Sequence, residues 1–221
     1  MPKKHSYYYI DEKLEHKSFG IKKFIFGFIC LGFILVVGYI LALMSSPVAL
    51  ANKPENLQSE ITNLKESNQN YLVIEKINLA VPLAKDKSSL SSKNGAWQQN
   101  SEQGNPEIGG NFIVCAYNFK LGITPALTKE ESVFYNLNKL EPNDVIEVFY
   151  NNISYKYKVE SKQDAPLDEE KLTLKSNTAK LTILTKSQSS KFGGGVAVVA
   201  LPIAESSKQN STTDSSQNIL F

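Results

Sequence analysis

Residues 180–200 read KLTILTKSQSSKFGGGVAVVA, and they contain two short apolar runs on either side of a polar and glycine-rich segment. The first run, at 181–185, ends in a single lysine, Lys186, and the second occupies 196–201. Short apolar runs bounded by turn-forming residues are typical of buried strands. The stretch therefore predicts two strands, and it raises the question of why a lysine stands where the first strand ends.

The residues before this stretch also predict β structure. Residues 153–159, ISYKYKV, alternate between apolar and polar side chains, which is the pattern of a half-buried strand. Asn151 and Asn152 join them to the apolar run at 145–150, and asparagine tolerates the positive φ angles of a two-residue hairpin. Two further strands are predicted at 71–77 and 111–117.

One helix is predicted between these strands. Thr128 and Glu131 have the spacing of a capping box, and four apolar residues follow on one helical face, namely Val133, Phe134, Leu137 and Leu140. Many short strands combined with one short helix favour a closed or partly closed β-barrel.

The N-terminal region contains a candidate membrane span. Residues 24–44 form an uncharged apolar run of 21 residues, and a bilayer core requires about 20 helical residues. Lysines that set the orientation are concentrated before this run, at Lys3, Lys4, Lys13, Lys17, Lys22 and Lys23, against Lys53 and Lys65 after it. We therefore expect a single-pass membrane protein with a cytoplasmic N-terminus and an extracellular domain.

A cleaved signal peptide is the competing interpretation of the same run. Ala49-Leu50-Ala51 has the small-x-small form of a cleavage site. The apolar run, however, is longer than the roughly 7 to 15 residues of a signal-peptide core, which favours a retained anchor.

The rest of the chain divides by composition. A polar stretch with weak amphipathic spacing at Leu57, Ile61 and Leu64 predicts a stalk that holds a short helix, and the Ser-, Thr-, Asn- and Gln-rich C-terminus predicts a disordered tail. The expected organisation is a cytoplasmic tail at 1–23, a transmembrane helix at 24–44, a stalk at 45–69, a β domain at 70–203 and a disordered tail at 204–221.

The composition excludes several kinds of chemistry. The chain contains no arginine, and its two histidines, His5 and His16, precede the apolar run. The expected exported part therefore has Cys115 alone and no histidine, which excludes a Ser-His-Asp triad, a Cys-His pair or a zinc-histidine site. Residues 70–203 hold 15 lysines against 14 acidic residues, too balanced for nucleic-acid binding. We expect no cofactor and no metal.

The order of these segments resembles the sortases, membrane-anchored cysteine transpeptidases of the bacterial cell surface. The resemblance rests on YLVIEKINLAVPL at 71–83, on GNPEIGGNFIVCAYNF at 104–119, on VFYNLNKLEPNDVIEVFY at 133–150, and on the strand LTILTK at 181–186. It implies a mainly β fold, a closed eight-stranded β-barrel with one or two short helices, preceded by a single transmembrane helix.

The resemblance also implies where catalytic residues would stand. In the family a Cys thiolate attacks a peptide bond of a sorting signal, a His acts as the acid, and an Arg steadies the oxyanion. Position by position, the family His falls on Tyr117, the family Cys on Lys186, and the family Arg on Gly195. The scaffold segments match and the catalytic residues do not, so we expect a catalytically inactive member.

Three residues are candidates to replace the missing catalytic groups. Attack by the Lys186 amine on a peptide would give a stable amide, so we expect a solvated lysine at a strand end. Cys115 is two residues before Tyr117 on the same face, but a lone thiol in an apolar strand is usually a buried hydrophobe. Tyr117 is interpreted as a packed aromatic residue whose hydroxyl is hydrogen-bonded.

Three functions remain open from the sequence. The favoured one is a non-catalytic domain that binds a sorting-signal-like peptide or a cell-wall component, or that assists surface-protein assembly. The alternative is a divergent transpeptidase or hydrolase that uses Thr185 or Ser187 with Lys186 as the base. The third is a passive surface domain.

Overall fold

The computed structural model describes residues 19–50, 57–90, 94–164, 169–187 and 195–203. The expected tail at 204–221, the cleavage site at Ala51 and most of the expected cytoplasmic tail lie outside these residues. The chain forms two compact units, which meet in the sequence between Leu41 and Ala42.

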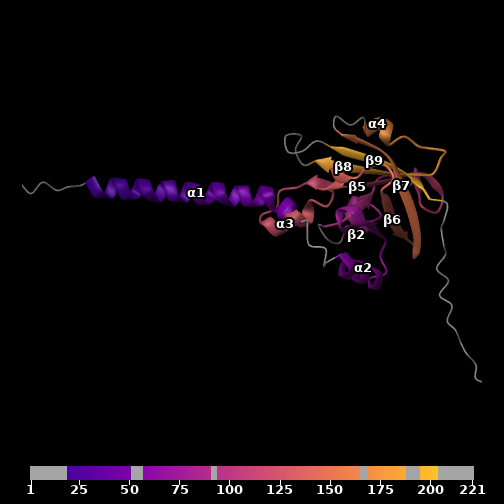
Figure 1. Ribbon diagram of the computed structural model, residues 1–221, viewed down its shortest axis with the longest axis horizontal. Coiled ribbons are helices and arrows are strands. Elements are labelled where there is room, and N and C mark those ends of the chain that lie inside the picture. Colours follow the sequence, from indigo (N-terminus) through magenta and orange to yellow (C-terminus); the bar gives the residue numbers. More distant parts are fainter. Residues whose placement is uncertain (1–18, 51–56, 91–93, 165–168, 188–194, 204–221) are drawn as a thin grey trace, which may run out of the picture. The chain divides into compact units, whose positions relative to one another are not determined.

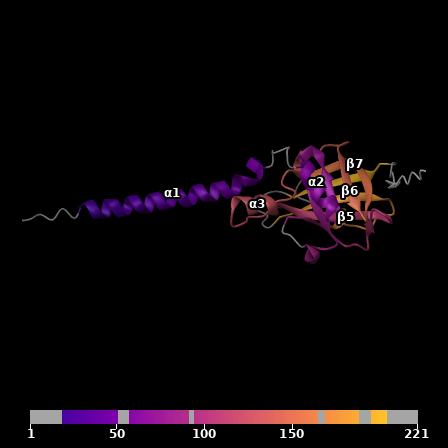
Figure 2. The ribbon, with the colours of Figure 1, turned by 90° about the horizontal axis from the view of Figure 1, so that it is seen from below.

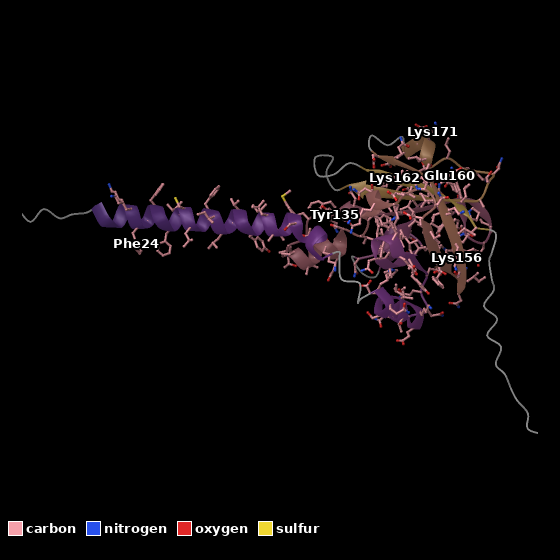
Figure 3. The ribbon with its side chains drawn as sticks, in the orientation of Figure 1. Phe24, Tyr135, Lys156, Glu160, Lys162 and Lys171 are labelled. Atoms are coloured by element: carbon pink, nitrogen blue, oxygen red, sulfur yellow. The ribbon has the colours of Figure 1, made fainter. Side chains whose placement is uncertain are left out.

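The first unit consists of most of α1, a helix that extends over Phe19–Leu50 (Figure 1). Its segment Lys22–Ser45 is long and apolar enough to cross a membrane, with a mean hydropathy of 2.7, and it contains the predicted span. Apolar side chains, Phe24 among them, project all around this helix (Figure 3), as expected for a helix surrounded by lipid. A signal sequence would meet the same criteria, so both interpretations of the segment persist.

The second unit is built on a closed β-barrel, as predicted. Its strands, within the described residues, are β1 (Tyr71–Ile74), β2 (Leu79–Ala84), β3 (Ala96–Gln98), β4 (Gly104–Asn105), β5 (Gly109–Phe119), β6 (Val145–Tyr150), β7 (Ile153–Asp164), β8 (Lys180–Ser187) and β9 (Val196–Pro202). The sheet order is β3-β2-β1-β6-β7-β9-β8-β5-β4, and pairing of β3 with β5 closes eight of these strands into a ring. Pairs β2–β3 and β5–β8 are parallel, so the barrel is mixed.

The predicted hairpin between β6 and β7 is confirmed. Asn151 and Asn152 have φ angles of 49° and 63°, the left-handed conformation that a two-residue turn requires. The pairing then runs from Tyr150↔Ile153 to Val145↔Lys158, which turns Tyr157 and Val159 inward and leaves Lys156 and Lys158 exposed.

Two predicted elements have different bounds. The strand expected at 71–77 ends at Ile74, because Glu75–Ile77 form a 3₁₀ turn that closes on Asn78 in the left-handed conformation. The helix expected to begin at Thr128 is instead α3 (Pro125–Glu131). Its cap is Thr124, whose side chain accepts a hydrogen bond from the Leu127 amide, and Pro125 fits the first turn because it needs no amide partner there.

The helix expected in the stalk exists as α2 (Leu57–Glu66), but it does not stand free of the barrel. Its apolar residues Leu57, Ile61 and Leu64 pack against a cluster on β1, β2 and β6. This cluster includes Tyr71 and Phe149, whose rings stack with centroids 4.2 Å apart. Figure 2 shows α2 lying across the barrel, so this part of the expected spacer belongs to the folded unit.

Candidate functional site

The positions carried over from the family resemblance lie on adjoining strands. Tyr117 on β5 and Lys186 on β8 are register partners in a parallel pair. Gly195 directly precedes β9, and the pairing of β8 with β9 includes Leu184↔Ala197. Continuing that antiparallel register by two residues on each strand brings Gly195 opposite Lys186. Tyr117, Lys186 and Gly195 therefore belong to one end of three neighbouring strands.

Lys186 forms an ion pair rather than standing free in solvent. Its ammonium contacts the carboxylate of Glu169 at 2.5 Å, and Glu169 begins the short helix α4 (Glu169–Leu172), which precedes β8 (Figure 1). The Lys186 side chain is 28% exposed, so it is partly solvated, but the ion pair with Glu169 was not predicted. The ion pair forms because the chain between β7 and β8 brings an acidic helix over the end of β8.

The Tyr117 side chain contacts two lysines. Lys87, in a 3₁₀ turn at Lys87–Ser89, donates a 2.7 Å hydrogen bond to the Tyr117 hydroxyl oxygen and lies 5.1 Å from the ring centroid. The Lys120 ammonium lies 5.4 Å from the same centroid. Trp97 on β3 packs against Tyr117 at 5.5 Å, and Lys87 lies over the Trp97 ring too. We call Lys87, Trp97, Tyr117 and Lys120 the Tyr117 cluster.

The lysines near Tyr117, including its register partner Lys186, differ in whether a carboxylate pairs with their ammonium group. Lys120 contacts the buried carboxylate of Glu131 at 3.3 Å, and Lys186 contacts Glu169. Lys87 is exposed and has no carboxylate partner within the described residues; its partners there are the hydroxyl and rings of the Tyr117 cluster. Lys87 is therefore the cation of this cluster best placed to meet an incoming carboxylate or carbonyl oxygen.

Cys115 is buried, as the sequence predicts, and its thiol also forms a hydrogen bond. Its Sγ donates to the Gln99 side-chain oxygen at 2.9 Å, and the residue is completely buried. Burial raises the pKa of the Cys115 thiol to about 12, and the Glu169 carboxylate adds to the rise while the Lys186 ammonium opposes it. Because the thiolate is the nucleophile, this environment keeps Cys115 unreactive near neutral pH.

The Thr185 hydroxyl, one of the two alternative nucleophiles, already accepts a hydrogen bond. Thr185 is buried, and its Oγ1 accepts a hydrogen bond from the Val196 amide at 2.6 Å. This contact ties β8 to the start of β9. Ser187 is the last residue of β8, and the structure does not describe its side chain.

Sequence reasoning missed the residues that surround the predicted positions. Lys87, Trp97, Lys120 and Glu169 come from four separate segments, and no spacing in the sequence connects them. Trp97 is the one tryptophan of the chain, which is a weak signal for a site. Barrel closure through β3 and β5 brings Trp97 beside Cys115 and hence close to Tyr117.

A closed, mixed eight-stranded barrel whose candidate site lies at the ends of β5, β8 and β9 is the sortase class of fold. Residues 72–198 match the family model of the sortase domain. The chain belongs to the sortase family.

Several solved structures are similar to the chain. Sortase E1 from Streptomyces coelicolor, determined with a tripeptide in its active site, is 16% identical, with 66% of this chain and 96% of that chain covered and a TM-score of 0.49. A lid mutant of sortase A from Corynebacterium diphtheriae is 16% identical, with 62% and 70% covered and a TM-score of 0.48. Sortase D5 from Clostridium perfringens is 19% identical, with 67% and 92% covered and a TM-score of 0.46. No curated protein matches the sequence.

Proposed function

We propose that this sortase-family chain is a membrane-tethered, extracytoplasmic domain that binds a sorting-signal-like peptide without cleaving it, as an accessory of surface-protein assembly. The observation that carries the proposal is the ion pair between Lys186 and Glu169. It occupies the position that the family resemblance assigns to the nucleophilic cysteine.

The surroundings of the described candidate nucleophiles Lys186, Cys115 and Thr185 support the non-catalytic part of the proposal. An amine paired with a carboxylate is protonated and is a poor nucleophile, and its attack on a peptide would end in a stable amide. Cys115 is buried and its thiol pKa is raised to about 12, while the Thr185 hydroxyl binds the Val196 amide. The alternative of a divergent transpeptidase therefore has little support from Thr185.

The Tyr117 cluster supports the binding part. It offers an ammonium donor, Lys87, beside two aromatic rings at the end of the barrel, and no carboxylate of the described residues pairs with it. Peptide carbonyl or carboxylate oxygens match the donor, and apolar side chains match the rings. Such a surface retains an extended peptide without polarising one of its bonds.

The N-terminal helix supports the location. α1 contains a segment long enough to cross a bilayer, and the lysines before it favour a cytoplasmic N-terminus. We further propose that the folded extracytoplasmic domain begins at α2, since Leu57, Ile61 and Leu64 pack against the barrel. The stalk would then be shorter than the expected 45–69.

A peptide titration tests binding and cleavage together. The full-length protein in detergent micelles is mixed with a sorting-signal peptide that carries a fluorophore and a quencher, and the emission of Trp97 is followed in parallel. We expect saturable changes in Trp97 emission, because this sole tryptophan packs 5.5 Å from Tyr117, and no release of the fluorophore. Steady cleavage would overturn the non-catalytic assignment.

A matched pair of variants locates the binding surface. Lys87→Ala removes the ammonium beside Tyr117 and should weaken peptide binding about tenfold, the loss typical of one charge-assisted hydrogen bond. Lys85→Ala removes an exposed lysine two residues away and should leave binding unchanged. Equal effects of the two substitutions, or no binding by the parent protein, would favour the passive surface domain.

A further inference from the structure

The loop that joins β5 to α3 exposes two large apolar side chains. Leu121 is 52% exposed and Ile123 is 82% exposed, and the exposed fraction of Ile123 exceeds that of every large apolar side chain described in α1. Both belong to the run LGITPAL at 121–127, which contains no charged residue and has Lys120 before it and Lys129 shortly after it. Exposed apolar side chains with lysines nearby are typical of segments that lie at a membrane surface.

The fold fixes the centre of this loop against α3. The Gly122 amide donates to the Thr128 hydroxyl oxygen at 3.0 Å, and the Lys120 amide donates to the Ser132 hydroxyl oxygen at 3.1 Å. A Cβ atom on Gly122 would lie 2.7 Å from the Thr128 backbone nitrogen, closer than van der Waals contact allows, so only glycine fits there. The exposure of the apolar side chains on either side of Gly122 is therefore built into the fold.

The loop lies on the side of the folded unit that the chain reaches first after the candidate span. Glu60, in the first turn of α2, and Lys129 of α3 line the same cleft, so α3 is a neighbour of the start of α2. Residues 46–56 connect the candidate span to α2, and a stretch of that length extends at most about 40 Å. The connection is therefore short enough for the α3 side of the folded unit to touch a membrane that α1 spans.

The charges near the loop do not form a basic patch. Lys120 contacts the Glu131 carboxylate at 3.3 Å. Burial raises the pKa of the Glu60 carboxyl, and the Lys129 ammonium opposes the rise. Glu130, exposed on α3, adds a further negative charge. Attraction to anionic lipid headgroups therefore has little basis here, and a contact with lipid depends on the apolar side chains.

We propose that Leu121 and Ile123 insert into the outer surface of the membrane that α1 spans and hold the barrel against the lipid. Interfacial segments of this kind bury their apolar side chains about 5 to 10 Å deep, and lipid accepts protruding side chains without a shaped pocket. The inference rests on the membrane tether of the proposed function and not on its peptide binding. Because the loop follows Tyr117 along the chain, the insertion holds the Tyr117 cluster close to the membrane surface.

Fluorescence quenching by lipids tests the insertion. The full-length protein is reconstituted in phosphatidylcholine vesicles that contain lipids with a nitroxide near the headgroup, and the apolar fluorophore bimane is attached to a single cysteine. Cys30→Ser with Ile123→Cys carries the label in the loop. Cys30→Ser with Ile108→Cys carries it in the turn between β4 and β5, at the opposite end of β5, where Ile108 is 72% exposed.

The expected result is a difference between the two labels. The nitroxide should quench the label at position 123 at least about twofold more than the label at position 108, because only the loop enters the interface. Quenching should persist at high salt, since the contact is apolar. Cys30→Ser alone is the blank, because the buried Cys115 thiol should not take up the label.

A matched pair of substitutions ties the quenching to the loop. Leu121→Ser should reduce quenching at position 123 by at least about half, because the loop loses one of its two inserted side chains. Leu174→Ser, which alters another exposed leucine outside the loop, should leave the quenching unchanged. Equal effects of the two substitutions would overturn the proposal.

The native cysteine of α1 separates the inference from the tether on which it rests. Bimane on Cys30 of the parent protein should be quenched by a nitroxide deep in the bilayer, because Cys30 lies within the candidate span. An unquenched Cys30 label would overturn the tether and the insertion together. A quenched Cys30 label with equal quenching at positions 123 and 108 would overturn the insertion alone. An emission shift at position 123 that depends on protein density and not on nitroxide would assign the loop to a second copy, which also overturns the proposal.

Discussion

Tyr117 and Lys186 are register partners on the parallel strands β5 and β8, yet their side chains have different counterparts. The Tyr117 hydroxyl accepts a hydrogen bond from Lys87, whereas the Lys186 ammonium pairs with Glu169. Each side chain at these two adjoining positions is thus stabilised by a partner from outside the barrel strands. In the proposed function, these two pairs belong to the peptide-binding surface.

Loss of the Lys186 ammonium should have a small effect on stability. The ion pair with Glu169 is partly exposed, at 28% and 50% for the two side chains, and such pairs contribute about 0.2 to 1 kcal/mol. Urea unfolding of Lys186→Ala, Glu169→Ala and the double variant should give a coupling energy in that range. A coupling of several kcal/mol would mean that the pair is far more shielded from water than its exposure indicates.

Cys115 should resist thiol reagents in the folded protein. An ordinary cysteine becomes thiolate near a pH of about 8.5, whereas burial raises the pKa of Cys115 to about 12. Because the folded-state pKa of Cys115 lies above the pKa of about 8.5 in the unfolded chain, folding is favoured while the thiol is protonated. The free energy of unfolding should therefore fall as the pH rises from about 8.5 toward about 12. Maleimide labelling of a Cys30→Ser variant should stay slow at mildly alkaline pH and become fast in denaturant. Rapid labelling without denaturant would place Cys115 at the surface.

Thr185→Val should destabilise the barrel. The substitution keeps the size of the side chain but leaves the buried amide of Val196 without its partner, at a cost of about 1 to 3 kcal/mol. Chemical unfolding measures the loss, and Ser161→Ala, at an exposed position of β7, serves as the control with a change below about 0.5 kcal/mol. Equal stability of the two variants would mean that the Thr185 hydroxyl does not anchor β9.

The lysine distribution predicts the orientation in the membrane. Protease added to intact cells should digest the chain beyond about residue 45 and leave the N-terminal segment protected, because lysines before the span stay in the cytoplasm. Immunoblotting with tags at either end measures the outcome. A protected C-terminal tag would reverse the orientation, and a mature chain starting near Ala51 would establish the signal-peptide interpretation.

The triple variant Tyr117→His, Lys186→Cys and Gly195→Arg tests the proposed residue correspondence. Only this variant, and not the parent, should form a covalent sulfur adduct with a sorting-signal peptide that carries an electrophile, and mass spectrometry detects it. All three changes are made together, because residues of a catalytic unit act non-additively. We expect a small gain, since the supporting residues have not been optimised for the chemistry.

Two controls accompany the triple variant. Circular dichroism establishes that it folds, since an arginine after a glycine-rich stretch can be strained. Glu169→Gln in the same background should raise adduct formation, because a carboxylate beside position 186 disfavours a thiolate there, just as the Glu169 carboxylate helps to raise the pKa of Cys115. If the folded variant reacts no faster than a free thiol, the correspondence of positions 117, 186 and 195 is wrong.

Local pattern was sufficient for most strands of the barrel, whereas β2 and β3 were not predicted. The alternating run 153–159 and the apolar runs at 111–117 and 181–185 form strands, and the asparagine pair before 153 forms the hairpin turn, because strand alternation and turn preference are encoded by neighbouring residues. The helix at 128 was misplaced for a related reason. Thr124 followed by Pro125 is the stronger start signal, and the apolar residues after Glu131 enter the core through turns instead.

The candidate site was only partly predictable. The sequence by itself determined the apolar N-terminal helix, most of the barrel strands, the absence of arginine and the lysine at the end of β8, since these depend on composition and local periodicity. Only the tertiary structure decided that Glu169 meets Lys186, that Lys87 and Lys120 both contact Tyr117, and that α2 packs against β1, β2 and β6. The physical reason is that these contacts join segments far apart in the chain. Barrel closure and helix docking bring such segments together, and no local spacing encodes them.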